Sequence, residues 1–285
     1  MEDLKLQTHE FDALLPQEIA LKVESIGVAK ARMSFIKTLS LAILAGAFIG
    51  FGSMFSTIVS IGTEIPWGLS RLITGICFSL GLILVIVAGA ELFTGNNLIS
   101  MAWASAKVKT IDVIRNWLIV YCGNFVGAIG LAVLMFFSRQ YTSANGAVGL
   151  KILTMAENKC NLDFMQAIVL GILCNVLVCL AVWLCFSAHT NTDKILSIIF
   201  PISAFVAAGF EHSVANMYVI PKALLIKTFA DSNFWNSIGK TPNDFPSISW
   251  TNFFINNLLP VSLGNVIGGA VLVGLVYWFV YLRKQ

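Results

Sequence analysis

The chain has 285 residues, of which 57% are apolar and only 12% are charged. A typical soluble domain carries about 25% charged residues, so this composition excludes an ordinary soluble enzyme, a disordered protein and a basic nucleic-acid binder. The net charge of +3 is too small to indicate a partner. We therefore expect an integral membrane protein in a lipid bilayer with no nucleic-acid partner, in which each span needs about 20 residues.

Residues 1–37 contain many charges and no long apolar run, so no cleavable signal peptide is predicted. We expect 1–37 to form a cytoplasmic N-terminal segment and 38–285 to form a transmembrane domain. Leu15, Ile19, Val23 and Ile26 recur at helical spacing after a start at Pro16. They predict an amphipathic helix over 16–31, which either anchors at the membrane surface or closes the cytoplasmic entrance of a pore.

Stretches without charge predict six membrane-spanning helices, at about 38–63, 72–90, 116–138, 164–187, 195–221 and 253–282. Aromatic residues gather near several of the predicted ends, as at membrane interfaces (Trp67, Trp117, Trp250 and Tyr281). With six spans, both termini lie on one side, and that side collects eleven Lys and Arg residues against seven on the other. This modest bias predicts cytoplasmic termini.

Two pairs of motifs indicate an internal repeat. Residues 89–96 and 209–216 both read G-x-E-x-x-x-x-N, and residues 123–128 and 264–269 both read G-N-x-h-G followed by a small residue. The pairs occur in the same order, in the second and third spans of each half. They predict two three-span repeats, about 38–150 and 151–285, of opposite orientation, as in channels and transporters with interrupted helices.

The interruptions in the second and fifth spans contain the two acids of the apolar segments, Glu91 and Glu211. A non-helical loop at this depth leaves backbone N–H groups that lipid cannot satisfy. We expect each carboxylate to accept those N–H groups at the start of the following half-helix. This interpretation makes Glu91, Glu211, Asn96 and Asn216 structural residues of the breaks, and a proton relay through the acids is the alternative.

His212 differs from the acids because the other repeat has Leu92 at the equivalent position. Histidine changes its charge near physiological pH, so its place at a helix break favours a role in a pore. Thr94 is expected to face the same region from the other half. Asn175, in the middle of the fourth span, fits either a helix–helix contact or a pore donor.

Several further residues have both a structural and a functional interpretation. Lys159 is a solvated loop lysine by default. A group of large apolar residues near the breaks fits either ordinary packing or a constriction that excludes hydrated ions (Phe78, Leu82, Leu92 and Phe205). The six cysteines form no C-x-x-C pair, and no catalytic triad, metal-ligand cluster or nucleotide-binding loop is found. We therefore predict no enzyme activity, no catalytic residue, no metal and no cofactor.

Four segments carry a resemblance to a known family: 11–16, 90–96, 209–217 and 257–265. On these motifs the chain resembles the formate/nitrite transporter family, and most closely its formate-channel branch, over about residues 11–284. The resemblance implies an aquaporin-like fold of six helices, two of them broken, with one pore per subunit. It also implies a homopentamer in the cytoplasmic membrane of a bacterium.

The resemblance also assigns roles to residues. The family's pore histidine corresponds to His212 and its threonine to Thr94, while its vestibule lysine corresponds to Lys159 and its mid-span asparagine to Asn175. The family's hydrophobic constriction corresponds to the four apolar residues named above (Phe78, Leu82, Leu92 and Phe205). For Lys159 the implied role is to attract an anion.

The implied function is a membrane channel for formate and similar small monovalent anions or their protonated acids. Its pH dependence would come from His212, which would share a proton with the substrate so that a neutral acid passes the constriction. Two alternatives stay open: a nitrite or hydrosulfide channel of the same family, and a proton-coupled secondary transporter of small monocarboxylates.

Overall fold

Helices form most of the chain that the computed structural model describes, residues 13–62 and 65–283. Six helices in these residues are long and apolar enough to cross a membrane, as predicted. They are α2 (Phe35–Val59), α3 (Trp67–Val87), α6 (Thr110–Phe137), α8 (Phe164–Ser187), α9 (Asn191–Ala208) and a last helix over Trp250–Tyr281. The last one joins α12 (Trp250–Asn252), α13 (Leu259–Val266) and α14 (Val276–Tyr281) through π-helical turns at Phe253–Leu258 and Ile267–Leu275.

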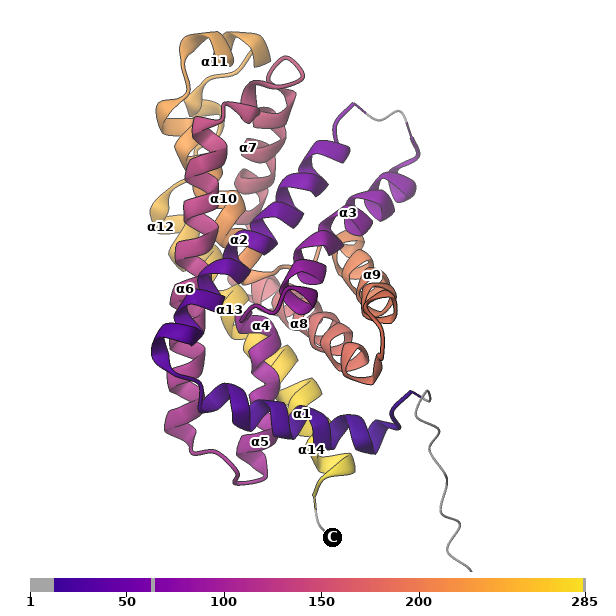
Figure 1. Ribbon diagram of the computed structural model, residues 1–285. Helices are drawn as coiled ribbons and strands as arrows, with labels where there is room; N and C mark the ends of the chain where they lie inside the picture. Colours follow the sequence, from indigo (N-terminus) through magenta and orange to yellow (C-terminus); the bar gives the residue numbers. More distant parts are fainter. Residues whose placement is uncertain (1–12, 63–64, 284–285) are drawn as a thin grey trace, which may run out of the picture.

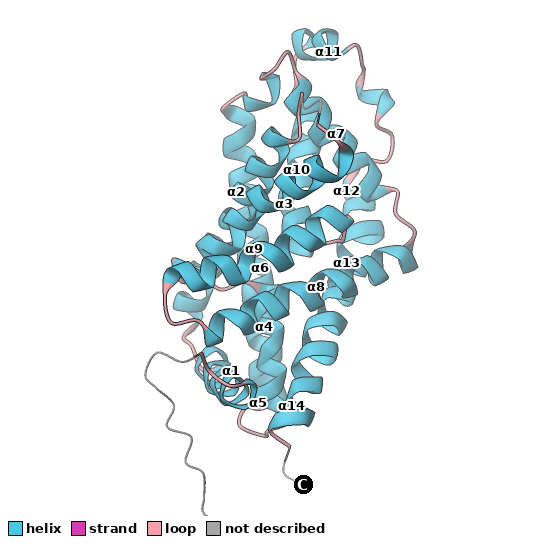
Figure 2. Cartoon of the chain, turned by 90° about the vertical axis from the view of Figure 1, so that its right-hand side faces the viewer, coloured by secondary structure: helices cyan, strands magenta, loops and turns pink. Residues whose placement is uncertain are grey.

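The remaining helices lie at the ends of the molecule or inside it. They are α1 (Pro16–Ala31), α4 (Phe93–Asn96), α5 (Ser100–Ala104), α7 (Ala147–Cys160), α10 (Ser213–Phe229) and α11 (Ser232–Ile238), with 3-10 turns at Asn97–Ile99, Gln140–Thr142 and Pro242–Asp244. Figure 1 shows α1, α5 and α14 at one end and α7 and α11 at the other. Figure 2 shows helices and loops throughout, with no strand in the described part of the chain.

The predicted and observed boundaries differ at helix starts and ends, and most for the fifth span, predicted over 195–221, because α9 ends at Ala208 and α10 runs on to Phe229. The fourth span was predicted over 164–187 and matches α8, and the amphipathic helix predicted over 16–31 matches α1. The third span was predicted from 116, whereas α6 begins at Thr110. Absence of charge marks the apolar part of a helix, and α6 has a further turn before it, where the Asp112 carboxylate accepts from the Lys109 N–H at 3.1 Å.

The two halves of the chain are packed in corresponding ways. In the first half, α2 packs on α3 and α6, and in the second half α8 packs on α9 and on the last helix. The halves meet where α3 contacts α9 and where α6 contacts α10. The second glycine of the G-N-x-h-G motif lets α6 lie close to α2 and the last helix close to α8, because a Cβ on Gly127 would be 1.9 Å from Ile43 O and one on Gly268 would be 2.3 Å from Ile172 O.

Candidate functional site

Two membrane-crossing segments are interrupted, one between α3 and α4 and the other between α9 and α10. We call these interruptions the first and second breaks. Gly89 and Gly209 adopt positive φ angles of +80° and +78° at the ends of α3 and α9. This backbone conformation is readily reached by glycine and strained for other residues. Both breaks therefore begin with the same local device, at the matching glycine of the G-x-E-x-x-x-x-N motif.

The backbone groups freed by the first break are satisfied by Asn124 of α6. Its Oδ1 accepts from the Phe93 N–H at 2.9 Å, and its Nδ2 donates to Glu91 O at 2.9 Å and Ala42 O at 2.7 Å. Asn124 has no exposed surface. A single buried amide thus joins α6, α2 and the start of α4.

Asn265 of α13 repeats this arrangement at the second break. Its Oδ1 accepts from the Ser213 N–H at 3.0 Å, and its Nδ2 donates to Glu211 O at 3.0 Å and Gly171 O at 2.8 Å. The expectation that the glutamate carboxylates accept these N–H groups is therefore wrong. An amide suits the position because it donates and accepts, whereas an ionised carboxylate only accepts.

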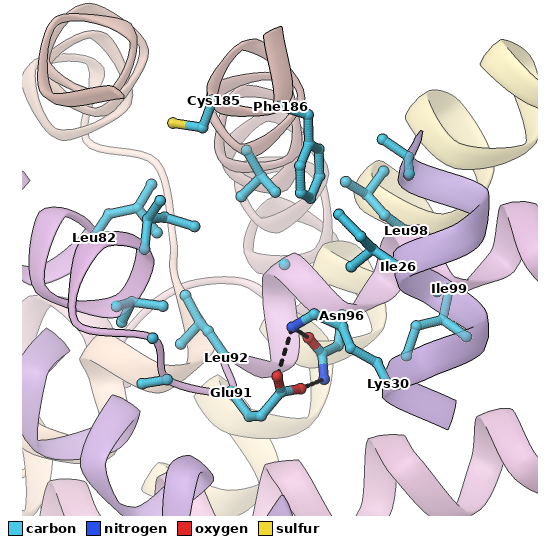
Figure 3. Close-up of a pocket in the computed structure, with 18 of the residues that line it drawn as sticks. Ile26, Lys30, Leu82, Glu91, Leu92, Asn96, Leu98, Ile99, Cys185 and Phe186 are labelled. Carbon is cyan, nitrogen blue, oxygen red and sulfur yellow. Dashed lines mark hydrogen bonds and ion pairs between the residues drawn. The ribbon is translucent and has the colours of Figure 1, made fainter. Parts of the chain in front are cut away.

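At the first break, the carboxylate binds side chains instead. Glu91 Oε1 lies 2.7 Å from Lys30 Nζ, and Glu91 Oε2 accepts from Asn96 Nδ2 at 2.7 Å (Figure 3). Asn96 Nδ2 also donates to Asn116 Oδ1 at 2.9 Å. Because Glu91 is only 5% exposed, the lysine and the asparagine compensate its charge where water does not.

The second break has the same set of groups. Glu211 Oε1 lies 2.6 Å from Lys159 Nζ, and Asn216 Nδ2 donates to Glu211 Oε2 at 2.7 Å and to Asn257 Oδ1 at 2.7 Å. Lys159 lies in the last turn of α7 and Lys30 in the last turn of α1, so these two lysines are counterparts. The structural equivalence of the halves therefore includes α1 and α7, earlier in each half than the three predicted spans.

His212 and Thr94 join the two breaks to each other. His212 Nε2 lies 3.0 Å from Thr94 Oγ1, and His212 Nδ1 accepts from the Ala215 N–H at 3.1 Å, which caps α10. Because Nδ1 accepts a hydrogen bond, the ring proton of the neutral imidazole lies on Nε2 and is donated to Thr94 Oγ1. Both side chains are buried.

Asn175 lies within α8 and has no exposed surface. Its Nδ2 is 2.6 Å from Asn265 O, 2.8 Å from Asn97 Oδ1 and 3.3 Å from Thr94 O. The amide hydrogens are thus directed to neighbouring protein atoms, and Asn175 lines neither of the cavities described below. In this structure it connects α8 to both breaks.

Two cavities approach the breaks from opposite ends. The α1-side cavity has a volume of about 430 Å³ and includes Lys30, Glu91, Leu82 and Leu92 in its lining. Figure 3 shows Leu82 and Leu92 beside this cavity, with Ile26 and Lys30 of α1 across it. The N-terminal helix α1 therefore forms part of the wall of this cavity.

The α7-side cavity has a volume of about 470 Å³ and reaches Phe78, Phe205, Lys159, Glu211 and His212. The rings of Phe78 and Phe205 meet edge to face, with centroids 5.5 Å apart. The four candidate constriction residues thus divide between the cavities, with the phenylalanines on one side and the leucines on the other. The His212–Thr94 pair lies where the two breaks meet, and His212 also lines the α7-side cavity.

Some residues of this site were not singled out by sequence reasoning: Lys30, Asn116, Asn257, Asn124 and Asn265. The repeated G-N-x-h-G motif contains two of them and was a usable signal. No sequence signal indicated that Lys30 and Lys159 are equivalent, because neither lysine belongs to a repeated motif. Among the described residues, no group of His, Cys, Asp and Glu side chains could hold a metal ion.

The protein has six membrane-crossing helices, and the breaks that follow two of them meet inside the molecule. Two cavities approach this meeting point from opposite ends and are separated by apolar side chains. These features define a multi-pass membrane protein of the channel and transporter class. The description "Formate/nitrite transporter" belongs to the family model that matches residues 17–279. The chain therefore belongs to the formate/nitrite transporter family.

Similar proteins of known name support this assignment. The chain is 46% identical to the formate channel FocA of Escherichia coli strain K12 over 276 residues, 96% of this chain and 97% of that protein. It is 41% identical to the formate channel FocA of Haemophilus influenzae over 263 residues, 92% of this chain and 93% of that protein. It also resembles a solved pentameric formate channel with formate bound, at 44% identity and a TM-score of 0.83, covering 87% of this chain and 98% of that chain.

Proposed function

We propose that this protein is a channel that passes formate, and similar small monovalent anions or their protonated acids, across the inner membrane of a bacterium. The observation that carries the proposal is the pair of opposed cavities separated by Phe78, Phe205, Leu82 and Leu92 beside the His212–Thr94 pair. Similarity to proteins named formate channels supports the choice of substrate.

The apolar constriction favours passage of the substrate as a neutral, protonated acid. A desolvated carboxylate is strongly disfavoured among phenylalanine and leucine side chains, whereas the neutral acid loses far less on leaving water. The proton on His212 Nε2 faces Thr94 Oγ1, so a substrate that replaces this contact receives a hydrogen bond from the imidazole. In this proposal the hydrogen bond from Nε2 holds formate while its carboxylate takes up a proton from solvent, because a neutral imidazole is far too weak an acid to give formate its own proton. The substrate then crosses in its protonated form, and the imidazole keeps its proton.

We also propose that five identical subunits assemble around a central axis, each with its own pore; the solved structure that this chain resembles is a pentameric formate channel. Many large apolar side chains of the membrane-crossing helices are exposed on the single subunit, among them Leu118, Leu134 and Phe200. Lipid and neighbouring subunits would cover them. Native mass spectrometry of the detergent-solubilised protein tests the assembly, and any stoichiometry other than five contradicts it.

The mechanism is tested by formate flux into proteoliposomes at two external pH values. Wild type should pass more formate at the lower pH, without needing an imposed proton gradient. His212→Phe removes this hydrogen-bond donor and should abolish the pH-dependent flux. His212→Asn should do the same while preserving the cap, since asparagine at this position still accepts from the Ala215 N–H.

Unchanged pH-dependent flux in both variants would contradict the role of His212. Saturable wild-type flux that stops when the proton gradient is collapsed would instead identify a proton-coupled transporter. Measurements on both variants are needed, because His212→Phe also removes the helix cap and by itself costs about 1 kcal/mol of stability.

A further inference from the structure

The charges that line the α7-side cavity do not balance. Its cations are Arg71, Lys151 and Lys159, and the acid in its lining is Glu211. Lys159 Nζ lies 2.6 Å from Glu211 Oε1, so this pair is neutral overall and gives little field at a distance. The uncompensated positive charge of the cavity therefore belongs to Arg71 and Lys151.

Arg71 is fixed against the second break. Its Nε donates to Ala207 O at 2.9 Å and its Nη2 donates to Val206 O at 2.6 Å, at the last carbonyls of α9. A Cβ on Gly209 would lie 3.3 Å from Nη2, so the guanidinium packs directly beside the break. The arginine is thus held in one orientation by the backbone whose regular hydrogen bonding the break interrupts.

These contacts leave the charge of Arg71 without a described carboxylate partner and several of its donors unused; the guanidinium also lies over the ring of Trp67, 6.0 Å from its centroid. Both acceptors are neutral carbonyls, and no described carboxylate lies within ion-pair distance of the guanidinium. A guanidinium has five N–H donors, and its fork geometry matches a carboxylate. Two donors hold α9, and the others remain available to an anion.

The position of Arg71 on α3 places it above the constriction. Arg71, Thr74 and Phe78 all line the α7-side cavity at helical spacing i, i+3 and i+7, so they lie on one face of α3. Phe78 in turn contacts Phe205. An anion that enters this cavity passes the arginine before it meets the phenylalanine rings.

We propose that Arg71 is the anion-binding residue of the α7-side cavity, where it concentrates and orients a monovalent carboxylate before the constriction. This inference rests on the proposed function for its substrate. It moves the attraction of anions from Lys159, which is neutralised by Glu211, to the arginine. A capping role alone would require the hydrogen bonds of Arg71 but not its charge.

The local field can be measured without any transport. Thr74→Cys places a thiol one turn from Arg71, and its reaction rates with methanethiosulfonates bearing a sulfonate or a trimethylammonium group are compared. We expect Arg71→Gln to lower the anionic-to-cationic rate ratio about fivefold, since one nearby charge changes the two rates in opposite directions. Arg71→Lys should keep the ratio, and Lys240→Gln, which removes an exposed charge outside the cavity, should leave it unchanged.

A titratable replacement covers the case in which Arg71→Gln does not fold. Arg71→His in the Thr74→Cys protein should raise the ratio when the pH falls from about 8 to 5.5, because the imidazole then gains a charge. The ratio should not change in this way with Arg71 present. The proposal is overturned if the anionic-to-cationic rate ratio is the same with glutamine, lysine and arginine at position 71. It is also overturned if the ratio of the Arg71→His protein does not change with pH.

Formate flux separates this inference from the function on which it rests. Arg71→Gln should raise the formate concentration for half-maximal flux about fivefold when formate is added on the α7 side, and Arg71→Lys should not. No formate flux in wild type would refute the proposed substrate while the reaction-rate ratio still tests the field. Normal wild-type flux with an unchanged half-maximal concentration in Arg71→Gln would refute only the role of Arg71.

Discussion

Asn124 and Asn265 each bond two backbone groups that a break leaves without helical partners and one carbonyl of a neighbouring helix. Leucine has a similar size but makes none of these bonds, and each buried unsatisfied group costs about 1–3 kcal/mol. We expect Asn124→Leu and Asn265→Leu to destabilise the protein strongly and to similar extents. Thermal unfolding of the purified protein in detergent measures this.

Asn256→Leu is the matched control for those variants. Asn256 is exposed, and its amide donates to another side chain, Asn252 Oδ1, at 3.2 Å. The control should unfold close to the wild-type temperature. A wild-type melting temperature for Asn124→Leu would show that the amide does not hold the break.

At this scale, sequence reasoning identified residue types better than it identified partners. It selected Glu91 and Glu211 but assigned them the wrong donors, since their bonds go to lysine and asparagine side chains. The partners of Asn124 include Ala42 O, which is 82 residues away in the sequence. Such pairs depend on which helices lie side by side, and motif spacing alone does not contain that information.

At the scale of elements, the ends of α1 and α7 are tied to the two breaks by equivalent ion pairs. Removing only one partner of a buried pair leaves an uncompensated charge, which typically costs about 3–5 kcal/mol. We expect Lys159→Met and Lys30→Met to lower the melting temperature. Adding Glu211→Gln or Glu91→Gln, respectively, should recover much of the loss, because no unpaired carboxylate then remains.

A double-mutant cycle for each pair provides the control. If the effects of the lysine and glutamate substitutions simply add, the ion pairs do not couple the helices to the breaks. Similar coupling energies are expected for the two pairs, since both glutamate side chains are 6% exposed and the lysines 25% and 19%.

Element lengths could be predicted well wherever the apolar run and the helix coincide, as in α8. The prediction for α6 began too late because its first turns carry charge outside the apolar run. The helix α1 is fixed to the first break, because Lys30 Nζ donates to Glu91 Oε1 and Asn96 Oδ1. Whether it anchors the chain or closes the entrance of a pore stays a prediction. Its sequence pattern predicted the helix but not the surface on which it lies.

At the scale of the whole molecule, we expect α1, α5 and α14 to face the cytoplasm and α7 and α11 to face outward. A cysteine at Lys109, beside the start of α6, should react with a membrane-impermeant maleimide only after the cells are permeabilised. A cysteine at Lys240, which follows α11, should react in intact cells. Both positions are exposed in the structure, so the reverse pattern of labelling would contradict the proposed orientation.

The overall class could be predicted from the sequence because composition and span length are determined by the bilayer, whichever partners the helices have. The six spans were predicted this way and are confirmed. The meeting of the two breaks through His212 and Thr94 joins residues 118 positions apart. The repeated motifs indicated such a meeting, but the hydrogen bonds that define it came from the structure.

The central claim, that this protein passes formate, is tested most directly by uptake of radiolabelled formate into proteoliposomes at two external pH values. Uptake should be rapid, should rise at the lower pH, and should be only partly blocked by nitrite, hydrosulfide, acetate or lactate. Absence of formate uptake, together with clear flux of hydrosulfide or nitrite through the same preparation, would contradict the account and assign a different substrate to the same fold.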